Sequence, residues 1–154
     1  MKVSRQSDYA LRALFALADR YPCEPVSIRQ LAAENHVPKR FLEHIMLDLK
    51  AQGWVESAPG KKGGYRLAKS PDRIYMGQVV RHFDGLLAPI SCVSASQYEP
   101  CSQEPGCRFR RVFLDIRNDL TRRMGAASLA SVMAGQPVRQ DEVFDELMIA
   151  GAGI

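Results

Sequence analysis

Residues 27–69 restrict the fold of this chain most, because two short amphipathic helical patterns are followed at once by a hairpin pattern. The first lies in "SIRQLAAENHV", where Ser27 and Gln30 have the spacing of a capping box. The second follows a turn of about four residues, with Pro38 suited to its first position and Gly53 as its stop signal. Its apolar residues are predicted to face inward: Phe41, Leu42, Ile45, Met46 and Leu49. This layout is that of a helix-turn-helix.

A β-hairpin is predicted directly after the second helix. The stretches "WVES" and "YRLAK" alternate as strands do, and "APGKKGG" between them supplies the Gly and Pro of a turn, with Lys61 and Lys62 at its tip. A helix-turn-helix that leads into a basic hairpin is more specific than either part alone, and it indicates a winged-helix domain that binds DNA. The alternative is a small α+β domain that binds another protein.

DNA binding requires positive charge where the second helix and the hairpin approach the duplex, because phosphates supply most of the attraction. Residues 1–75 carry 13 Lys and Arg against 8 Asp and Glu, whereas residues 76–154 carry 8 against 9. Side chains near the start of the second helix are candidates for base contact, and those at the hairpin tip for phosphate or minor-groove contact. For each one the alternative is a solvated surface position. The predicted DNA-binding residues are Arg29, Lys39, Arg40, Glu43, His44, Lys61 and Lys62.

Helical spacing also occurs on both sides of this unit. Residues 7–20 form one predicted helix, with Ser7 or Asp8 as its cap. Residues 108–124 form another, and its apolar stripe needs a surface to cover it. A second copy of the chain is the simplest partner, because most soluble oligomers have two-fold symmetry; the alternative is packing on its own domain. The stripe consists of Phe109, Val112, Phe113, Ile116, Leu120 and Met124.

These patterns predict a mainly α fold with a small β-hairpin wing. We expect a winged helix-turn-helix DNA-binding domain over residues 1–80. A cysteine loop and dimerisation helix would occupy residues 81–135, and a C-terminal tail residues 136–154. No run approaches the 18 consecutive apolar residues of a membrane span, and the start "MKVSRQSDYA" lacks the features of a signal peptide. We therefore expect a cytoplasmic protein with no membrane partner.

Three of the four cysteines, Cys92, Cys101 and Cys107, lie in one polar loop. A reducing cytoplasm disfavours disulfides, so clustered thiols indicate a metal, redox sensing or catalysis. The fourth, Cys23, fits an inert buried cysteine. The spacing does not match the paired C-x2-C of structural zinc sites, whereas iron–sulfur clusters use Cys thiolates at looser spacing. A [4Fe-4S] or [2Fe-2S] cluster would require a fourth ligand from outside the loop.

The chain resembles the IscR/NsrR/RirA-type family of bacterial winged-helix regulators over residues 1–135. The resemblance rests on "SDYALRAL", on the whole of residues 27–69, and on the cysteine triplet before a long helix. It implies a homodimer with crossing long helices, and cluster ligation by the three loop cysteines. Members that use a histidine as fourth ligand place it where this chain has Arg110, which cannot ligate a metal. Others use a carboxylate near the N-terminus of the partner subunit, and Asp8 stands at that place; a helix cap is its alternative role.

The function expected is that of a dimeric transcription factor, a repressor, that binds a double-stranded DNA operator. Its operator affinity would depend on an iron–sulfur cluster that senses iron, redox state or nitric oxide. The alternative is the same DNA-binding head with cysteines that act as a thiol/disulfide or zinc switch. An enzyme is not expected, since the three histidines are scattered and no nucleophile motif, phosphate-binding loop or carboxylate pair stands out.

Overall fold

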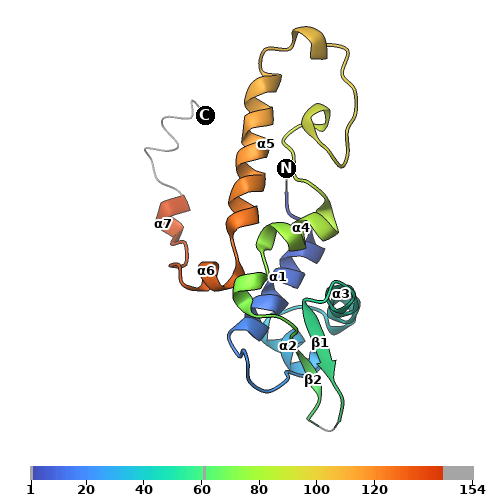
Figure 1. The fold of residues 1–154 in the computed structure, drawn as a ribbon, viewed down its shortest axis with the longest axis vertical. Helices are drawn as coiled ribbons and strands as arrows, with labels where there is room; N and C mark the ends of the chain where they lie inside the picture. Colours follow the sequence, from blue (N-terminus) through green and yellow to red (C-terminus); the bar gives the residue numbers. More distant parts are fainter. Residues whose placement is uncertain (1, 61, 144–154) are drawn as a thin grey trace.

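The computed structural model describes residues 2–60 and 62–143, and it is mostly helical with one antiparallel hairpin (Figure 1). This confirms the predicted fold class. The α-helices and strands, in chain order, are α1 (Arg5–Ala18), α2 (Ile28–Glu34), α3 (Lys39–Ala51), β1 (Val55–Ala58), β2 (Gly64–Leu67), α4 (Met76–Asp84), α5 (Arg110–Ala126), α6 (Leu129–Met133) and α7 (Gln140–Val143). Three 3-10 turns lie between them: η1 (Pro71–Arg73), η2 (Ser91–Val93) and η3 (Glu104–Gly106). Of the predicted tail, residues 144–154 lie outside the described residues.

The core forms around α1, which contacts α3, α4, α6 and β2. Apolar residues three and four positions apart fall on one face of each helix, so each of α1–α4 turns an apolar face toward this centre. We refer to α1–α4 together with the hairpin as the head. Leu14, Leu31, Leu42 and Leu49 are completely buried there. Burying one such side chain contributes about 1.5–3 kcal/mol, so this cluster is what fixes α3 and the hairpin relative to α1.

The helix starts follow local capping, with one difference from expectation. Ser27 caps α2 as predicted, because its hydroxyl accepts a hydrogen bond from the Gln30 main-chain nitrogen at 3.2 Å. Helix α1, however, is capped by Ser4 and begins before Ser7. The prediction of Ser7 or Asp8 as the cap is wrong, since Ser7 lies fully buried inside the helix.

The hairpin is fixed to the head through Val26. Strands β1 and β2 pair antiparallel, with Val55 opposite Leu67. The main chain of Tyr65 then exchanges two hydrogen bonds with Val26, at 2.9 and 2.8 Å, so the hairpin continues onto the segment that precedes α2. A Cβ atom at Gly64 would collide with the main chain of Val26 there, which explains the glycine.

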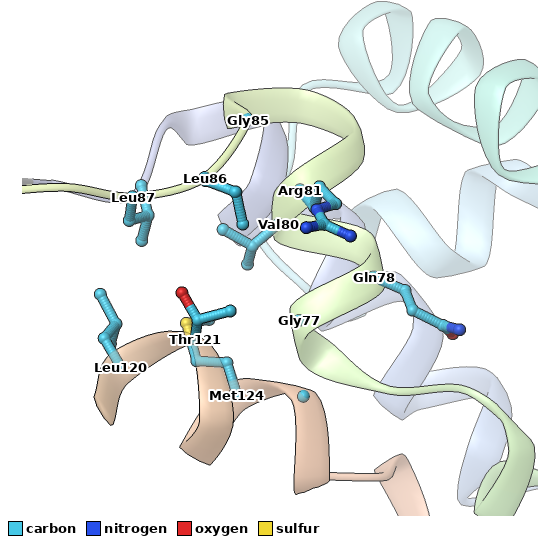
Figure 2. Close-up of a pocket in the computed structure, with 11 residues that line it drawn as sticks. Gly77, Gln78, Val80, Arg81, Gly85, Leu86, Leu87, Leu120, Thr121 and Met124 are labelled. Carbon is cyan, nitrogen blue, oxygen red and sulfur yellow. The ribbon is translucent and has the colours of Figure 1, made fainter. Parts of the chain in front are cut away.

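Helix α5 stands away from this core, and none of its residues is buried (Figure 1). It contacts α4 near its C-terminal end and η2 nearer its N-terminal end. Val112 and Ile116 on its outer face are 58% and 42% exposed. Between α4 and α5 lies a mostly apolar cavity of ≈ 150 Å³, into which Val80, Leu120 and Met124 project (Figure 2).

Candidate nucleic-acid interface and cysteine loop

The exposed face of α3 carries the four side chains predicted to reach base edges. Lys39, Arg40, Glu43 and His44 are all exposed. Lys39 and Glu43 form an ion pair at 3.4 Å, and Nδ1 of His44 lies 2.9 Å from the main-chain oxygen of Arg40. Both contacts are local to the helix, so the polar groups lie along one solvent-facing surface. Glu43 is held against a lysine, which reduces the negative charge that α3 presents to a phosphate backbone.

Phe41 lies on this same surface, and the prediction that it faces inward is wrong. Its side chain is 61% exposed, whereas Leu42 is completely buried. At 3.6 residues per turn, Phe41 lies about 40° beyond Ile45 around the helix, just outside the buried stripe. Leu47 is similarly exposed at 60%. The face of α3 that points away from the core is therefore partly apolar as well as charged.

Two other elements add basic groups at this end of the molecule, where Figure 1 shows α2, α3 and the hairpin gathered together. Arg29 on α2 and Lys62 in the hairpin turn are exposed. Lys61 lies outside the described residues. Arg66 on the hairpin pairs with Glu56 across the two strands at 2.6 Å. Lys62 is the described basic side chain in the hairpin turn itself.

The cysteine loop lies at the opposite end, beyond the first turn of α5 (Figure 1). Cys92, Cys101 and Cys107 all carry free thiols and line one open cavity of ≈ 580 Å³. Cys92 and Cys107 are half-buried, and Cys101 is exposed. Among the described residues, no three His, Cys, Asp or Glu side chains lie close enough to hold a metal ion. The fold thus brings the thiols around one cavity but not within ligating distance of a common point.

A half-buried carboxylate, that of Glu104, organises this loop. The Glu104 side chain accepts hydrogen bonds from the main-chain nitrogen of Cys101 at 3.1 Å and from the Tyr98 hydroxyl at 3.0 Å, and it pairs with Arg110 at 3.3 Å. Arg110 in turn donates to the main-chain oxygen of Cys92. The hydrogen bond to Glu104 raises the pKa of Tyr98 above its ordinary value, with further increases from desolvation and from the negative charge of Glu104.

Comparisons with known proteins identify the family to which this fold belongs. Residues 3–135 match the model of the Rrf2 family, described as iron-dependent transcriptional regulators. The chain belongs to the Rrf2 family. It is 42% identical over 120 residues to an rrf2-like HTH-type transcriptional regulator of Rhodobacter capsulatus, covering 74% of this chain and 80% of that one. It is 32% identical over 133 residues to NsrR of Geobacillus kaustophilus, covering 86% and 90%.

Solved structures of Rrf2-type regulators show the same fold. CymR of Bacillus subtilis, the global cysteine regulator, matches with a TM-score of 0.73 at 23% identity, covering 89% of this chain and 99% of that one. IscR of T. potens matches with a TM-score of 0.68 at 24% identity, covering 93% and 96%. The family and its relatives are named as transcriptional regulators, not enzymes. Within the described part of this Rrf2-family chain, no helix is both long enough and apolar enough to cross a bilayer.

Asp8 does not line the cysteine cavity of its own chain. It pairs with Arg12, one turn further along α1, at 2.8 Å, and its side chain is 44% exposed. Cys23 is exposed, so the prediction of a buried inert cysteine is wrong. It follows α1 in a turn between Pro22 and Pro25, where its side chain is open to solvent.

The sequence reasoning missed Glu104 in this Rrf2-family loop. The pattern C-x-x-E indicates this contact. It places the Glu104 carboxylate three residues after Cys101, whose main-chain N–H donates to it, as in a capping box. The sequence alone identifies Arg110 only as a residue that cannot ligate a metal. Its role in the structure is to contact Cys92 and Glu104 together.

Proposed function

We propose that this Rrf2-family regulator is a dimeric, cytoplasmic repressor whose affinity for its DNA operator depends on an iron–sulfur cluster. The observation that carries the proposal is that three free thiols, from separate turns of one loop, line one open cavity. Thiolates are the usual ligands of such clusters, so the donor set fits. Cys92, Cys101 and Cys107 would hold a [4Fe-4S] or [2Fe-2S] cluster, which supplies a centre that reacts with oxidants and nitric oxide or is lost when iron is scarce.

The DNA-binding surface of this proposal is the exposed face of α3 with the hairpin turn. Lys39, Arg40, Glu43 and His44 would meet base edges in the major groove, because residues near the start of a recognition helix do so. Arg29 from α2, with Lys61 and Lys62 from the hairpin, would contact phosphates or the minor groove. Because these groups would act from one DNA-binding domain, small changes in how the two domains of a dimer are spaced would change binding to adjacent half-sites.

Dimerisation would use the outer face of α5. Phe109, Val112 and Ile116 are 63%, 58% and 42% exposed, although all three are apolar. A second copy of α5 covers such a stripe most simply, since a two-fold axis lets the same residues meet each other. The proposed division into a DNA-binding domain (1–80), a loop and dimerisation helix (81–135) and a tail (136–154) follows from these roles.

Communication between the two ends would run along α5. Its first residues hold the cysteine loop through Arg110, and its last turn crosses α4, which packs on α1 in the head. Three cysteines joined at one centre would keep the loop ordered, and their release would loosen it. A coupling free energy of about 1–3 kcal/mol would change operator affinity by about 5- to 150-fold.

The fourth ligand in this proposal is Asp8 of the partner subunit. Its ion pair with Arg12 is exposed, and exposed pairs contribute only about 0–1 kcal/mol. D8A should therefore leave the fold intact but shorten the lifetime of the cluster toward an iron chelator. R12A is the matched control, because it breaks the same ion pair and keeps the carboxylate. Equal lifetimes in D8A and R12A would remove Asp8 as a ligand.

A second candidate function keeps the same DNA-binding head but uses the cysteines as a thiol/disulfide or zinc switch. It is favoured by the absence, among the described residues, of any preformed group of three metal-ligating side chains. Visible absorbance of protein purified without oxygen separates the two candidates. A cluster absorbs visible light, whereas the zinc and disulfide forms are colourless.

The deciding experiment uses one DNA duplex, selected by this protein from a random pool. It compares the affinity for this duplex of anaerobic protein that has iron and sulfide with that of anaerobic protein that lacks them. At fixed salt, we expect operator affinities that differ by about 5- to 150-fold, with native mass spectrometry reporting cluster mass and dimer together. Equal affinities would refute cluster control. Colourless, iron-free protein whose affinity changes with thiol oxidation or zinc would favour the second candidate.

A further inference from the structure

We propose that Glu104 is the positioning residue of the cysteine loop, holding the main chain at Cys101 and, through Arg110, at Cys92. This inference rests on the proposed function only in the role given to the thiols, which is to hold an iron–sulfur cluster. The Glu104 and Arg110 side chains are 17% and 33% exposed, whereas those of the α5 pair Arg111–Asp115 are 76% and 55% exposed. A partly buried ion pair is screened less by water and salt than a surface pair.

The Glu104 carboxylate has three partners from three parts of the chain. It accepts a hydrogen bond from the Cys101 main-chain nitrogen at 3.1 Å, another from the Tyr98 hydroxyl at 3.0 Å, and it faces Arg110 at 3.3 Å. Hydrogen bonds to an ionised group are shorter and stronger than neutral ones. A single side chain therefore ties the middle of an otherwise irregular loop to the first turn of α5.

Arg110 extends this connection to the start of the loop. Its guanidinium donates to the main-chain oxygen of Cys92 through Nε at 3.2 Å and Nη2 at 2.8 Å. Arg117, two turns further along α5, donates to the main-chain oxygen of Val93 at 2.8 Å. The η2 turn that carries Cys92 is thus fastened to α5 at two neighbouring carbonyls, and the Cys101 segment reaches the same helix through Glu104.

The third cysteine joins the same unit through the main chain. The Cys107 nitrogen donates to the main-chain oxygen of Glu104 at 3.4 Å, closing the η3 turn. The main chain at each of the three thiol-bearing residues is therefore bonded to Glu104 or to the arginine that pairs with it. Without the carboxylate, Cys101 would keep its position only through the turns on either side, and the separation between the thiols would no longer be fixed.

The test uses reduced protein without iron or sulfide, so it does not require a cluster. We compare E104A with E99A, because Glu99 lies in the same loop and makes no side-chain hydrogen bond to any described residue. In E104A, amide hydrogen exchange over residues 98–107 and alkylation of half-buried Cys92 should both become about tenfold faster, as expected when local opening becomes easier. E99A should match the wild type.

Two conservative variants keep the test decisive if E104A folds poorly. E104Q retains an oxygen that can accept from the Cys101 N–H but loses the charge that faces Arg110, so its exchange rate should fall between those of wild type and E104A. R110K keeps a positive charge but lacks the planar group that spans Cys92 and Glu104, so Cys92 should become more reactive while Cys101 N–H protection remains. Far-UV circular dichroism checks that the helices are unchanged.

Failure of this inference and failure of the proposed function give different results. Wild-type rates in E104A and E104Q would overturn the positioning role, whether or not the protein carries a cluster. Faster exchange in E104A, in a protein that never takes up iron and sulfide, would support the positioning role and refute the cluster. In protein that does take up a cluster, chelator-driven loss should be about fivefold faster in E104A than in E99A.

Discussion

Gly77 of α4 crosses α5 so closely that a Cβ atom at this position would lie 2.9 Å from the main-chain nitrogen of Gly125. The main-chain carbonyl carbon of Met124 would be equally near, at 2.9 Å. Both neighbours are backbone atoms of a helix, so neither can move aside as a flexible side chain could. This crossing is where α5, the helix that follows the cysteine loop, meets the head, and its geometry requires the absence of a side chain at residue 77.

G77A should therefore destabilise the protein by about 1–3 kcal/mol, the usual cost of overpacking a close contact. The matched control is G125A, because a Cβ atom there would meet nothing within 4 Å. Alanine at position 125 should be neutral or stabilising by about 0.5–1 kcal/mol, since glycine is unfavourable inside a helix. Urea unfolding monitored by circular dichroism measures both. Equal stabilities of the two variants would contradict the close crossing.

F41A should separate stability from DNA binding. Phe41 is 61% exposed, so its removal should change the free energy of unfolding by less than about 0.5 kcal/mol. L42A, one residue along and fully buried, should lose about 2–5 kcal/mol. If the exposed face of α3 meets DNA, the operator affinity of F41A should fall about fivefold, because one buried apolar contact contributes about 1 kcal/mol. A loss of unfolding free energy in F41A as large as that in L42A, or an unchanged operator affinity, would count against this surface.

The parts of the fold that could be read from sequence are those set by local periodicity and turn chemistry. Ser27 caps α2 because its hydroxyl reaches a nitrogen three residues away, which spacing alone reveals. The hairpin was equally accessible, since strand alternation and a Gly-rich turn are both short-range signals. Phe41 marks the limit of this reasoning. It is adjacent to the apolar stripe in sequence, and only the packing of α1 against α3 decides where the stripe ends.

The arrangement of the cysteine loop could not be read in the same way. The contact between Arg110 and Cys92 joins residues 18 apart, and it depends on the path of a loop without regular secondary structure. The spacing of the cysteines shows that three thiols lie close in sequence, but it does not show which carboxylate and guanidinium order them. Cys23 shows the same limit, because a cysteine beside prolines can lie at the surface as easily as in the core.

The dimer proposal predicts that a charge on the outer face of α5 separates the subunits. Ile116 is 42% exposed, and I116D would place a carboxylate in the proposed contact on both subunits. The dissociation constant of the dimer should rise at least about tenfold, equivalent to about 1.4 kcal/mol. R122D introduces the same side chain on another face of α5 and should leave the dimer intact. Sedimentation velocity over a concentration series provides the measurement, and equal behaviour of the two variants would argue against this face.

The hairpin should contribute to DNA binding through phosphate contact. K62A should lower the slope of log affinity against log salt by about 0.9 for each hairpin that touches a phosphate, and hence by about 1.8 in a dimer. Arg122 on α5 pairs with Asp119 at 3.0 Å, far from the hairpin in sequence, so R122A should leave the slope unchanged. Fluorescence anisotropy over a range of salt concentrations measures the slope. Identical slopes in K62A and wild type would remove Lys62 from the interface.

The hydrogen bond between Tyr98 and Glu104 should be visible in the titration of the tyrosine. Acceptance by the Glu104 carboxylate raises the pKa of Tyr98 above its ordinary value of 10.0. In E104Q the negative charge is gone, so the pKa of Tyr98 should return toward 10.0, whereas E99Q should leave it raised. Ultraviolet absorbance of tyrosinate, with Y98F subtracted, isolates this group from the other tyrosines.

The same shift fixes the sign of the pH dependence of stability. A group whose pKa is higher in the folded chain favours folding while it is protonated, so the contribution of Tyr98 is complete below pH 10.0. It is lost as the pH rises through the higher pKa of the folded state. The stability difference between wild type and Y98F should therefore be constant at neutral pH and change only in alkaline solution. A difference that already varies between neutral pH and mildly alkaline pH would show that Tyr98 does not donate to Glu104.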